Sequence, residues 1–355
     1  MKYELIAKII AQRVRSGDYV LGEIPSEREL AITHGVSHMT ARRAVEKLIQ
    51  DGQLIRKPNG RLAANRHSSN GADGKVINVA YLTPAWSAMS YSKWHAAIIQ
   101  EASPQNILIR PVMYVHWQDA TVAEALRSFD GVFLVSSTEP IPDLVQDQLA
   151  QSQAAVVSVE IDMSRIGLPS ICPFPANCVQ TVLDHLAALG HTHIACINSQ
   201  PGCPDVGERI SQWRLWCGLR KYPCDLYDSP IEPYEDPFNA SYKLAGELLD
   251  SGNLKATAVL AVTAPGALGF MRAVHERGLT VGRDIAVCTI NDEGLAKYIN
   301  PTLTSITMTD LSPYITFCLD WMKSESKRWV GPLVMQPTSP PLFIGESTSP
   351  PRLPG

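Results

Sequence analysis

Two arginines and two small hydroxyl side chains lie close together near the start of the chain, and their chemistry suits an anionic partner. Arg28 and Arg42 each carry a guanidinium group that can donate paired hydrogen bonds to a phosphate or to a guanine edge. Ser37 and Thr40 offer hydroxyl groups that suit phosphate oxygens and base edges. These residue types suit a surface that binds an anionic partner such as a phosphate-bearing molecule.

The residues around these side chains predict two short helices in succession. Ser26 and Glu29 have the spacing of a capping box, in which each side chain accepts a hydrogen bond from the other residue's backbone N–H group. Gly35 predicts the end of this helix, because glycine adopts the left-handed conformation without steric cost. Ser37 predicts the start of a second helix, which Gly52 ends. A helix turned sharply from a capped partner can place its first turns in the major groove.

A third helix and a hairpin complete the predicted unit. Residues 3–15 have one apolar face and are expected to pack under the two capped helices. Leu54 to Arg56 predict a strand, followed by a turn over residues 58–61. Asn59-Gly60 is a strong hairpin signal, since both residues tolerate positive φ. The apolar face of the second capped helix consists of Ala41, Ala44, Val45 and Leu48.

This stretch resembles the winged helix-turn-helix of the GntR family over about the first 65 residues. The matching residues are Pro25-Ser26-Glu27-Arg28-Glu29-Leu30-Ala31, Gly35-Val36-Ser37, Thr40, Arg42 and Ala44. The family usually has arginine at position 38, so His38 is expected to weaken or shift base choice. For either helix alone, the alternative is an ordinary capped helical hairpin whose polar face is only solvated. The resemblance implies DNA contacts by Arg28, Ser37, His38, Met39, Thr40, Arg42, Asn59, Gly60 and Arg61.

Composition limits the class of protein. A chain of 355 residues with 45% hydrophobic residues suggests two or three globular domains. It has no apolar run of about 18 residues, which excludes a transmembrane helix, and no secretory signal opens it, so we expect a cytoplasmic location. The net charge of −4 combines a basic N-terminal region with an acidic remainder. This split is typical of a chain that meets phosphate only at its N-terminal end.

The cysteines and histidines do not predict a metal site or a cofactor. The 8 cysteines are scattered and form no C-x-x-C pair, which favours buried free thiols over disulfides or metal ligands. His191-Thr192-His193 has no carboxylate or cysteine at a helpful spacing. The chain also lacks a P-loop, G-x-G-x-x-G after its first α/β strand, G-x-S-x-G and H-E-x-x-H, so an enzyme is not predicted.

The rest of the chain predicts an α/β fold with two lobes. Residues 66–75 are rich in Ser, Asn, Gly and Asp and predict a linker. From residue 76, short Val- and Ile-rich runs alternate with helical stretches such as 177–189 and 265–277. This alternation indicates right-handed βαβ units and parallel sheets. The length favours two lobes with a cleft at the carboxyl ends of the strands.

Several segments of this region resemble the periplasmic-binding-protein-like sensor of the LacI family over about residues 76–351. They are Asp130-Gly131-Val132, Leu189-Gly190-His191-Thr192-His193-Ile194-Ala195, residues 267–287, Pro301-Thr302-Leu303-Thr304 and residues 342–351. The family's effector-binding arginine matches Arg209. A buried arginine can hold sugar hydroxyls or an anion, and a structural or surface arginine is the alternative.

Other cleft positions depart from that family. Its sugar-binding aspartate is Asn291 here, although Asp292 remains, and Phe174-Pro175 replaces the family's Asp-Asn pair at the lobe crossover. A plain hexose is therefore doubtful as the ligand, and a modified, acidic or non-sugar effector is the alternative. Glu160 and Asp162 also follow a strand and are candidates for the cleft. The first-lobe residues expected at the strand ends are Trp86, Ser87, Tyr91 and Ser136, together with Ser137.

Together, the two resemblances imply a chimeric repressor similar to arabinose-responsive GntR/LacI regulators. The expected parts are a winged helix-turn-helix over 1–65, a linker over 66–75 and an effector-binding and dimerisation domain over 76–351. The expected partners are double-stranded operator DNA, a small-molecule effector such as a carbohydrate, and a second copy of the chain, with no membrane. A sensor-like domain that only dimerises is one alternative. A transporter's solute-binding protein is another, which the winged segment and the missing signal peptide oppose.

Overall fold

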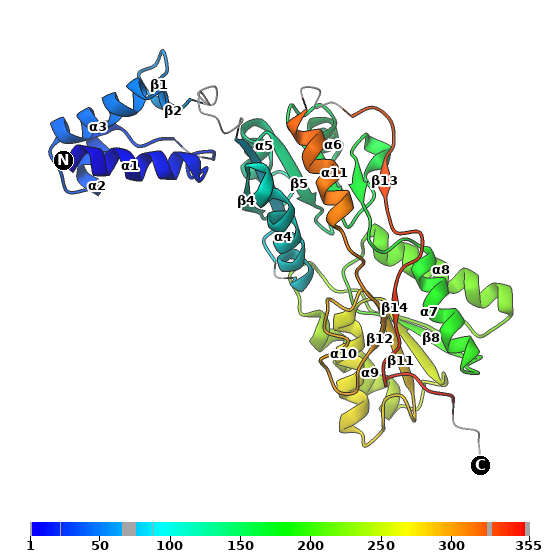
Figure 1. The fold of residues 1–355 in the computed structure, drawn as a ribbon. Coiled ribbons are helices and arrows are strands. Elements are labelled where there is room, and N and C mark those ends of the chain that lie inside the picture. Colours follow the sequence, from blue (N-terminus) through cyan, green and yellow to red (C-terminus); the bar gives the residue numbers. More distant parts are fainter. Residues whose placement is uncertain (1, 22, 66–75, 87, 325–328, 352–355) are drawn as a thin grey trace.

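The chain folds into an N-terminal head and two α/β lobes (Figure 1). The computed structural model describes residues 2–21, 23–65, 76–86, 88–324 and 329–351. The predicted linker over 66–75 lies outside these described residues. Within them, no helix is both long enough and apolar enough to cross a membrane.

The head contains three helices and a two-stranded hairpin, as predicted. Their bounds are α1 (Lys2–Arg15), α2 (Glu27–Thr33), α3 (His38–Gln50), β1 (Leu54–Arg56) and β2 (Leu62–Ala64). The two strands pair antiparallel. One apolar core joins all of these elements, because each contributes a buried side chain to it. Its members include Ile6, Ile10, Leu30, Val45, Leu48, Leu54 and Leu62.

The first lobe is a six-stranded sheet in the order β13-β7-β6-β5-β3-β4, and all of its pairings are parallel. Alternate residues of β3 enter two cores. Val79 and Tyr81 face α4 and α11, whereas Ala80 and Leu82 face α5 and α6. The strands are β3 (Ile77–Pro84), β4 (Ile107–Tyr114), β5 (Gly131–Val135), β6 (Ala155–Val159), β7 (Ser170–Ile171) and β13 (Val334–Met335). The helices are α4 (Met89–Ala102), α5 (Ala120–Ser128), α6 (Asp143–Ala150) and α11 (Ser312–Lys323).

The second lobe repeats this plan in the order β14-β12-β11-β10-β8-β9. Its sheet is parallel except for β14, which pairs antiparallel with β12 at the edge. Helices α7 and α8 cover one face, and α9 and α10 cover the other. The strands are β8 (Ile194–Asn198), β9 (Leu226–Asp228), β10 (Ala258–Ala261), β11 (Ala286–Ile290), β12 (Thr304–Ile306) and β14 (Leu342–Phe343). The helices are α7 (Asn177–Ala188), α8 (Pro204–Arg220), α9 (Pro237–Asp250) and α10 (Ala264–Glu276).

The chain passes between the lobes three times. It crosses between β7 and α7, returns between β12 and α11, and crosses again between β13 and β14. Neither lobe is therefore a continuous segment of sequence. A relative movement of the lobes must act on these three crossings.

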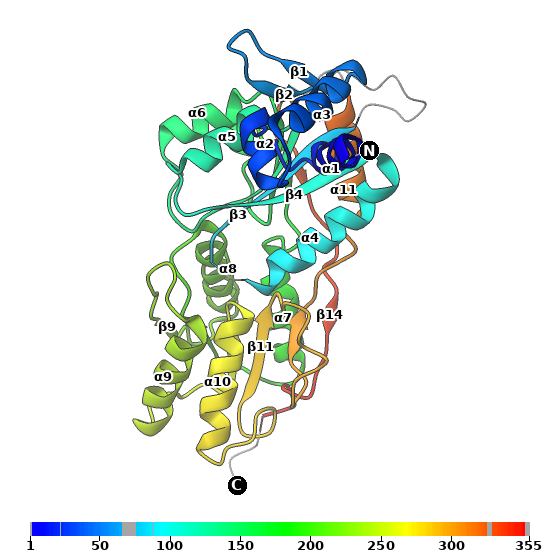
Figure 2. The ribbon, with the colours of Figure 1, turned by 90° about the vertical axis from the view of Figure 1, so that its left-hand side faces the viewer.

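The head lies against the first lobe and away from the second (Figures 1 and 2). The contact joins the segment after α1 to β4. Nη1 of Arg110 on β4 donates to Oδ1 of Asp18 at 3.0 Å and to the carbonyl oxygen of Ser16 at 3.3 Å. Val20 packs against the first-lobe core. Gly17 has φ +71°, and a Cβ at this position would lie 3.1 Å from Oδ1 of Asn78. We call this set of contacts the head–lobe contact.

All eight cysteines are free, and six of them are buried. The prediction of buried thiols is wrong for Cys224, which is exposed, and Cys203 is partly exposed. Burial raises the pKa of the thiols of Cys172 and Cys178 to about 12.

One cysteine is therefore expected to react quickly with a thiol reagent. In the native protein, Ellman's reagent should modify Cys224 first, because the buried thiols are both inaccessible and protonated. Cys224→Ser should remove the fast phase, and Cys172→Ser should leave it intact. A fast phase that persists in the Cys224→Ser protein would contradict the burial described here.

Candidate nucleic-acid interface and interlobe cleft

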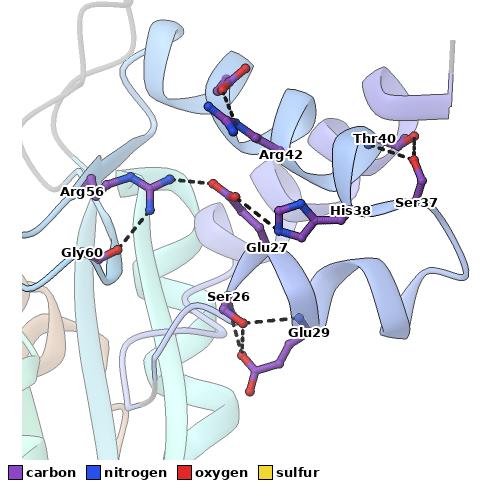
Figure 3. Close-up of polar contacts among 10 residues, drawn as sticks. Ser26, Glu27, Glu29, Ser37, His38, Thr40, Arg42, Arg56 and Gly60 are labelled. Carbon is purple, nitrogen blue, oxygen red and sulfur yellow. Dashed lines mark hydrogen bonds and ion pairs between the residues drawn. The ribbon is translucent and has the colours of Figure 1, made fainter.

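The capping box that starts α2 is present in full. Oγ of Ser26 accepts from the backbone N–H of Glu29 at 3.3 Å, and Oε2 of Glu29 accepts from the backbone N–H of Ser26 at 2.8 Å (Figure 3). These hydrogen bonds lower the pKa of Glu29. At the start of α3, Oγ of Ser37 accepts from the backbone N–H of Thr40 at 3.2 Å, and their hydroxyl oxygens lie 2.9 Å apart. Both hydroxyls therefore hold the first turn of α3 in shape.

Arg42, one of two arginines on α3, is held along its own helix. Nε of Arg42 donates to Oε1 of Glu46 at 2.8 Å, and this hydrogen bond raises the pKa of Arg42. The Arg42 side chain is 55% exposed. The guanidinium of Arg42 would have to break or share its hydrogen bond with Glu46 to contact another molecule such as DNA. Met39, about one turn closer to the start of α3, is also exposed.

A single carboxylate joins the wing to both helices. Oε1 of Glu27 accepts from Nη2 of Arg56 at 2.6 Å, and Oε2 of Glu27 lies 3.8 Å from Nε2 of His38 (Figure 3). Nη1 of Arg56 also donates to the carbonyl oxygen of Gly60 at 3.1 Å. Sequence analysis missed Glu27 and Arg56 as positioning residues, because they are 29 positions apart and no local pattern connects them.

The wing turn differs in detail from the expected Asn-Gly turn. Gly60 has φ +81°, but Asn59 is not in the left-handed region. The backbone N–H of Gly60 donates to the carbonyl oxygen of Lys57 at 2.8 Å, so Pro58 and Asn59 form the centre of the turn. Oδ1 of Asn59 accepts from the backbone N–H of Arg61, which itself forms an ion pair with Glu23. The hairpin prediction is confirmed, and only the assignment of positive φ to Asn59 is wrong.

A hollow of about 920 Å³ lies between α2, the start of α3 and the wing. It brings together five residues that sequence analysis placed on DNA, although they come from three separate segments. Met39, Thr40 and Arg42 on α3, and Ser37 at its N-cap, lie outside this lining. The five predicted residues that line the hollow are Arg28, His38, Asn59, Gly60 and Arg61.

A second cavity, of about 560 Å³, lies between the two lobes. Its first-lobe wall consists of the segments after β5 and β6, which contribute Ser136 and Asp162. Its second-lobe wall is the segment 202–204 that leads into α8. The cavity thus lies at the carboxyl ends of the strands, as predicted for parallel sheets. We call this cavity and the residues around it the interlobe cleft.

Arg209 on α8 reaches from the helix toward the end of β10. Its Nη1 donates to the carbonyl oxygen of Val262 at 2.7 Å, and its guanidinium lies 6.0 Å from the ring centre of Phe174. Asp205, one turn earlier on α8, has a raised pKa because burial disfavours its charge more than Arg209 favours it. Arg209 does not line the interlobe cavity itself, and its role in effector binding stays a prediction.

Two aromatic residues meet across the lobes. The ring centres of Trp86 and Tyr234 lie 5.2 Å apart with an edge-to-face geometry. The hydroxyl of Tyr234 donates to the carbonyl oxygen of Val115 in the first lobe at 2.9 Å.

Burial and the charge of Glu160 raise the pKa of Tyr91. The predicted residue Ser87 lies outside the described residues.

The remaining predicted cleft residues have mainly local partners. Oγ of Ser136 donates to the carbonyl oxygen of Ser137 at 2.9 Å. Oδ1 of Asn291 accepts from the backbone N–H of Glu293 at 3.1 Å. Oδ2 of Asp292 accepts from the backbone N–H of Ala296 at 3.2 Å, and Asp292 lines a separate hollow of about 440 Å³. Asn291 and Asp292 thus shape the turn after β11.

Glu160 lies next to the first-lobe wall of the interlobe cleft but does not line the cavity. It follows β6, has φ +74°, and its Oε1 accepts from Nε1 of Trp94 at 3.0 Å. Burial raises its pKa to about 7, whereas hydrogen bonds from Ser90 and Trp94 oppose that rise. Within the described part of the chain, no group of three or more His, Cys, Asp or Glu residues is placed to hold a metal ion.

Comparison with known proteins identifies both parts of the chain. Residues 2–62 match the bacterial regulatory proteins of the gntR family, and residues 183–309 match the periplasmic binding protein-like domain. The chain is 30% identical over 165 residues to the HTH-type transcriptional regulator GalR of Streptococcus thermophilus, which covers 45% of this chain and 49% of that protein. It spans about half or less of the length of the curated relatives it matches.

Two solved structures share the two-lobe fold. A LacI family transcriptional regulator from Enterococcus faecium with bound ribose superposes with a TM-score of 0.63 at 19% identity, covering 78% of this chain and 100% of that chain. The lac repressor dimer bound to operator and the anti-inducer ONPF has a TM-score of 0.63 at 19% identity, covering 81% and 99%. The chain thus joins a helix-turn-helix domain of the gntR family of bacterial regulatory proteins to a two-lobe domain with the periplasmic binding protein-like fold.

Proposed function

We propose that this protein is a transcriptional repressor whose affinity for operator DNA is controlled by a small molecule bound in the interlobe cleft. The observation that carries the proposal is the hollow of the head, where Arg28, His38 and the wing tip converge on one exposed surface. Groove-reading heads recognise paired half-sites, so the working form is a homodimer. We place the protein in the cytoplasm, where its DNA target is found.

The relatives support this proposal. One is named a transcriptional regulator, one solved structure holds ribose, and another is a dimer on its operator. In this chain, an effector between the lobes would act on the three crossings and move the lobes relative to each other. The head–lobe contact joins the head to the first lobe through Arg110 and Asp18. Lobe movement in a dimer would therefore change the spacing of the two heads.

The direct test is binding to the DNA upstream of the protein's own gene, measured over a range of salt concentrations. A specific complex should be tighter than the complex with random DNA, and its affinity should fall steeply with salt because phosphate contacts release counterions. Equal affinity for the upstream DNA and for random DNA would show that the operator does not lie in this upstream DNA. If a library of genomic fragments also yields no preferred site, the repressor function is wrong.

Arg28 is expected to contribute directly to operator binding. Arg28→Ala should weaken the operator complex by about 1–3 kcal/mol if the guanidinium reads a base, and should flatten the salt dependence if it contacts a phosphate. Arg272→Ala on α10 is the matched control, because it also removes an exposed arginine but lies in the second lobe. Fluorescence anisotropy with labelled operator measures both. Equal losses in the two variants would show that Arg28 acts only through net charge.

A further inference from the structure

Residues 16–20, which follow α1, pack against two different parts of the protein. Tyr19 packs against the apolar core of the head, whereas the next residue, Val20, packs against a core of the first lobe. Neighbouring residues stay within one peptide unit of each other, so these two contacts tie the head to the first lobe. We call residues 16–20 the docking segment.

The carboxylate of Asp18 is hydrogen-bonded on both sides. Its Oδ2 accepts from Nε of Arg13 on α1 at 3.1 Å, and its Oδ1 accepts from Nη1 of Arg110 on β4 at 3.0 Å. The same Nη1 donates to the carbonyl oxygen of Ser16 at 3.3 Å. The side chains of Asp18 and Arg110 are only 30% and 34% exposed, so water screens their ion pair less than it screens a fully exposed pair. Asp18 and Arg110 therefore connect α1 to the outermost strand of the first-lobe sheet.

The backbone of the docking segment also lies close to the lobe. Gly17 has φ +71°, a conformation that favours glycine, and a Cβ at this position would lie 3.1 Å from Oδ1 of Asn78 and 3.7 Å from Cγ of Arg110. Asn78 and Arg110 belong to β3 and β4, which are neighbours in the sheet. The contact thus combines backbone, apolar and charged groups, which together fix the orientation of the head better than one ion pair can.

The wing does not share this close contact with the lobe. A cavity of about 540 Å³ lies between the wing and α5. Lys57 and Arg61 of the wing line one side of it, and Glu124 and Arg127 of α5 line the other. The head therefore has room to turn on this side if the contacts of the docking segment are broken.

We propose that the docking segment and Arg110 hold each head at a fixed position on its sensor domain, so that the protein selects operators by the spacing of their half-sites. This inference rests on the proposed repressor function and concerns which operators the protein accepts. In a dimer, two heads fixed in this way present their reading surfaces at one separation and one angle. A head without these contacts can turn to meet half-sites at other separations. Arg110 acts through Asp18 and is a positioning residue.

The test is fluorescence anisotropy with the full-length protein and three labelled DNAs. They are the operator fragment with its half-sites mapped by footprinting, the same fragment with about half a helical turn (about 5 base pairs) inserted between the half-sites, and a single half-site. For the parent protein, the insertion should weaken binding about 100-fold or more, because it turns one half-site away from its head.

Arg110→Ala should relax this spacing preference without damaging the reading surface. The insertion should weaken binding of the variant about tenfold or less, because a released head can follow the displaced half-site. Binding to the single half-site should change less than about twofold, which a general loss of folding in the head would not allow.

Asp18→Asn tests the same contact from the side of the head. It keeps the size of the side chain and removes the charge that Arg110 binds. It should relax the spacing preference as Arg110→Ala does, and the double variant should add nothing further, because both changes break one ion pair. Arg272→Ala is the matched control, because it removes an exposed, ion-paired arginine of the second lobe. The control should keep the spacing preference of the parent.

Hydrogen exchange measured by mass spectrometry gives a second readout that needs no DNA. In Arg110→Ala, the backbone amides of the docking segment should exchange faster than in the parent, and those of α3 should exchange at the same rate. An unchanged rate in the docking segment would show that Arg110 does not hold the head.

The outcomes separate this inference from the proposed function. A parent protein that tolerates the inserted base pairs overturns the inference and keeps the repressor function. A spacing preference that both variants leave unchanged overturns the role of the ion pair. If the protein binds no DNA specifically, the repressor function and the spacing role both fail, and hydrogen exchange still decides whether Arg110 holds the docking segment.

Discussion

Replacing Gly269 by alanine should destabilise the second lobe by about 3 kcal/mol, because this glycine allows α10 to touch α9. A Cβ at position 269 would lie 2.4 Å from the carbonyl oxygen of Phe238, and 2.9 Å from both Cβ of Ser241 and the backbone nitrogen of Tyr242. Two of these three atoms belong to the backbone of α9, so no side-chain rotation can relieve the overlap. The helices must separate, which exposes part of the core that they share.

The same helix provides the control. A Cβ on Gly266 would have its nearest neighbour, Cβ of Ala261, at 3.6 Å, which is an ordinary contact. Gly266→Ala should therefore keep or slightly raise stability, since alanine favours the helix by about 1 kcal/mol over glycine. Thermal unfolding should show a loss of about 6–12 °C for Gly269→Ala and no loss for Gly266→Ala. Equal melting temperatures would show that α9 and α10 are not packed as closely as described.

Arg209→Ala should abolish the effector response and leave operator binding unchanged. Its guanidinium connects α8 to the end of β10, because its Nη1 donates to the carbonyl oxygen of Val262. Without it, a small molecule bound between the lobes loses a charged hydrogen-bond donor. Loss of a charged hydrogen-bonding group costs about 1.5–3 kcal/mol, which corresponds to about 10- to 150-fold weaker effector binding.

The measurement compares operator affinity with and without a small molecule that a thermal-shift screen shows to bind the protein. Arg283→Ala is the control, because Arg283 is an exposed second-lobe arginine paired with its neighbour Asp284. The control protein should respond as the parent does. A large fall in the melting temperature of Arg209→Ala would show that the hydrogen bond to Val262 is structural. An unchanged response would remove Arg209 from the effector site.

Local features were predictable from the sequence because their causes are local. The capping box of Ser26 and Glu29 needs only a spacing of three residues, and the predicted strands and helices of both lobes are confirmed with small shifts at their ends. The wing turn shows the limit of such rules. Asn59-Gly60 predicts two residues with positive φ, but Pro58 at the centre of the turn leaves only Gly60 in that region.

Contacts between distant segments could not be predicted in this way. Glu27 and Arg56 meet because α2 and the hairpin pack on the same core, and neither residue carries a local signal. Tyr234 and Val115 are 119 positions apart and meet only because the lobes are joined by three crossings. The resemblance also could not predict that the carboxylate of Asp292 accepts from the backbone N–H of Ala296 in its own turn, and its role in effector binding stays a prediction.

The position of β4 has a consequence for self-association. It is the outermost strand of the first-lobe sheet, and such an edge is an open template for another strand. Pro111 in β4 lacks an N–H group, the neighbouring Arg110 brings a charge, and the head lies beside both. Strand addition between two copies is therefore blocked on this side. The head covers part of this edge, so a fragment without residues 2–65 would keep Pro111 and Arg110 but leave the edge of β4 more open to strand addition.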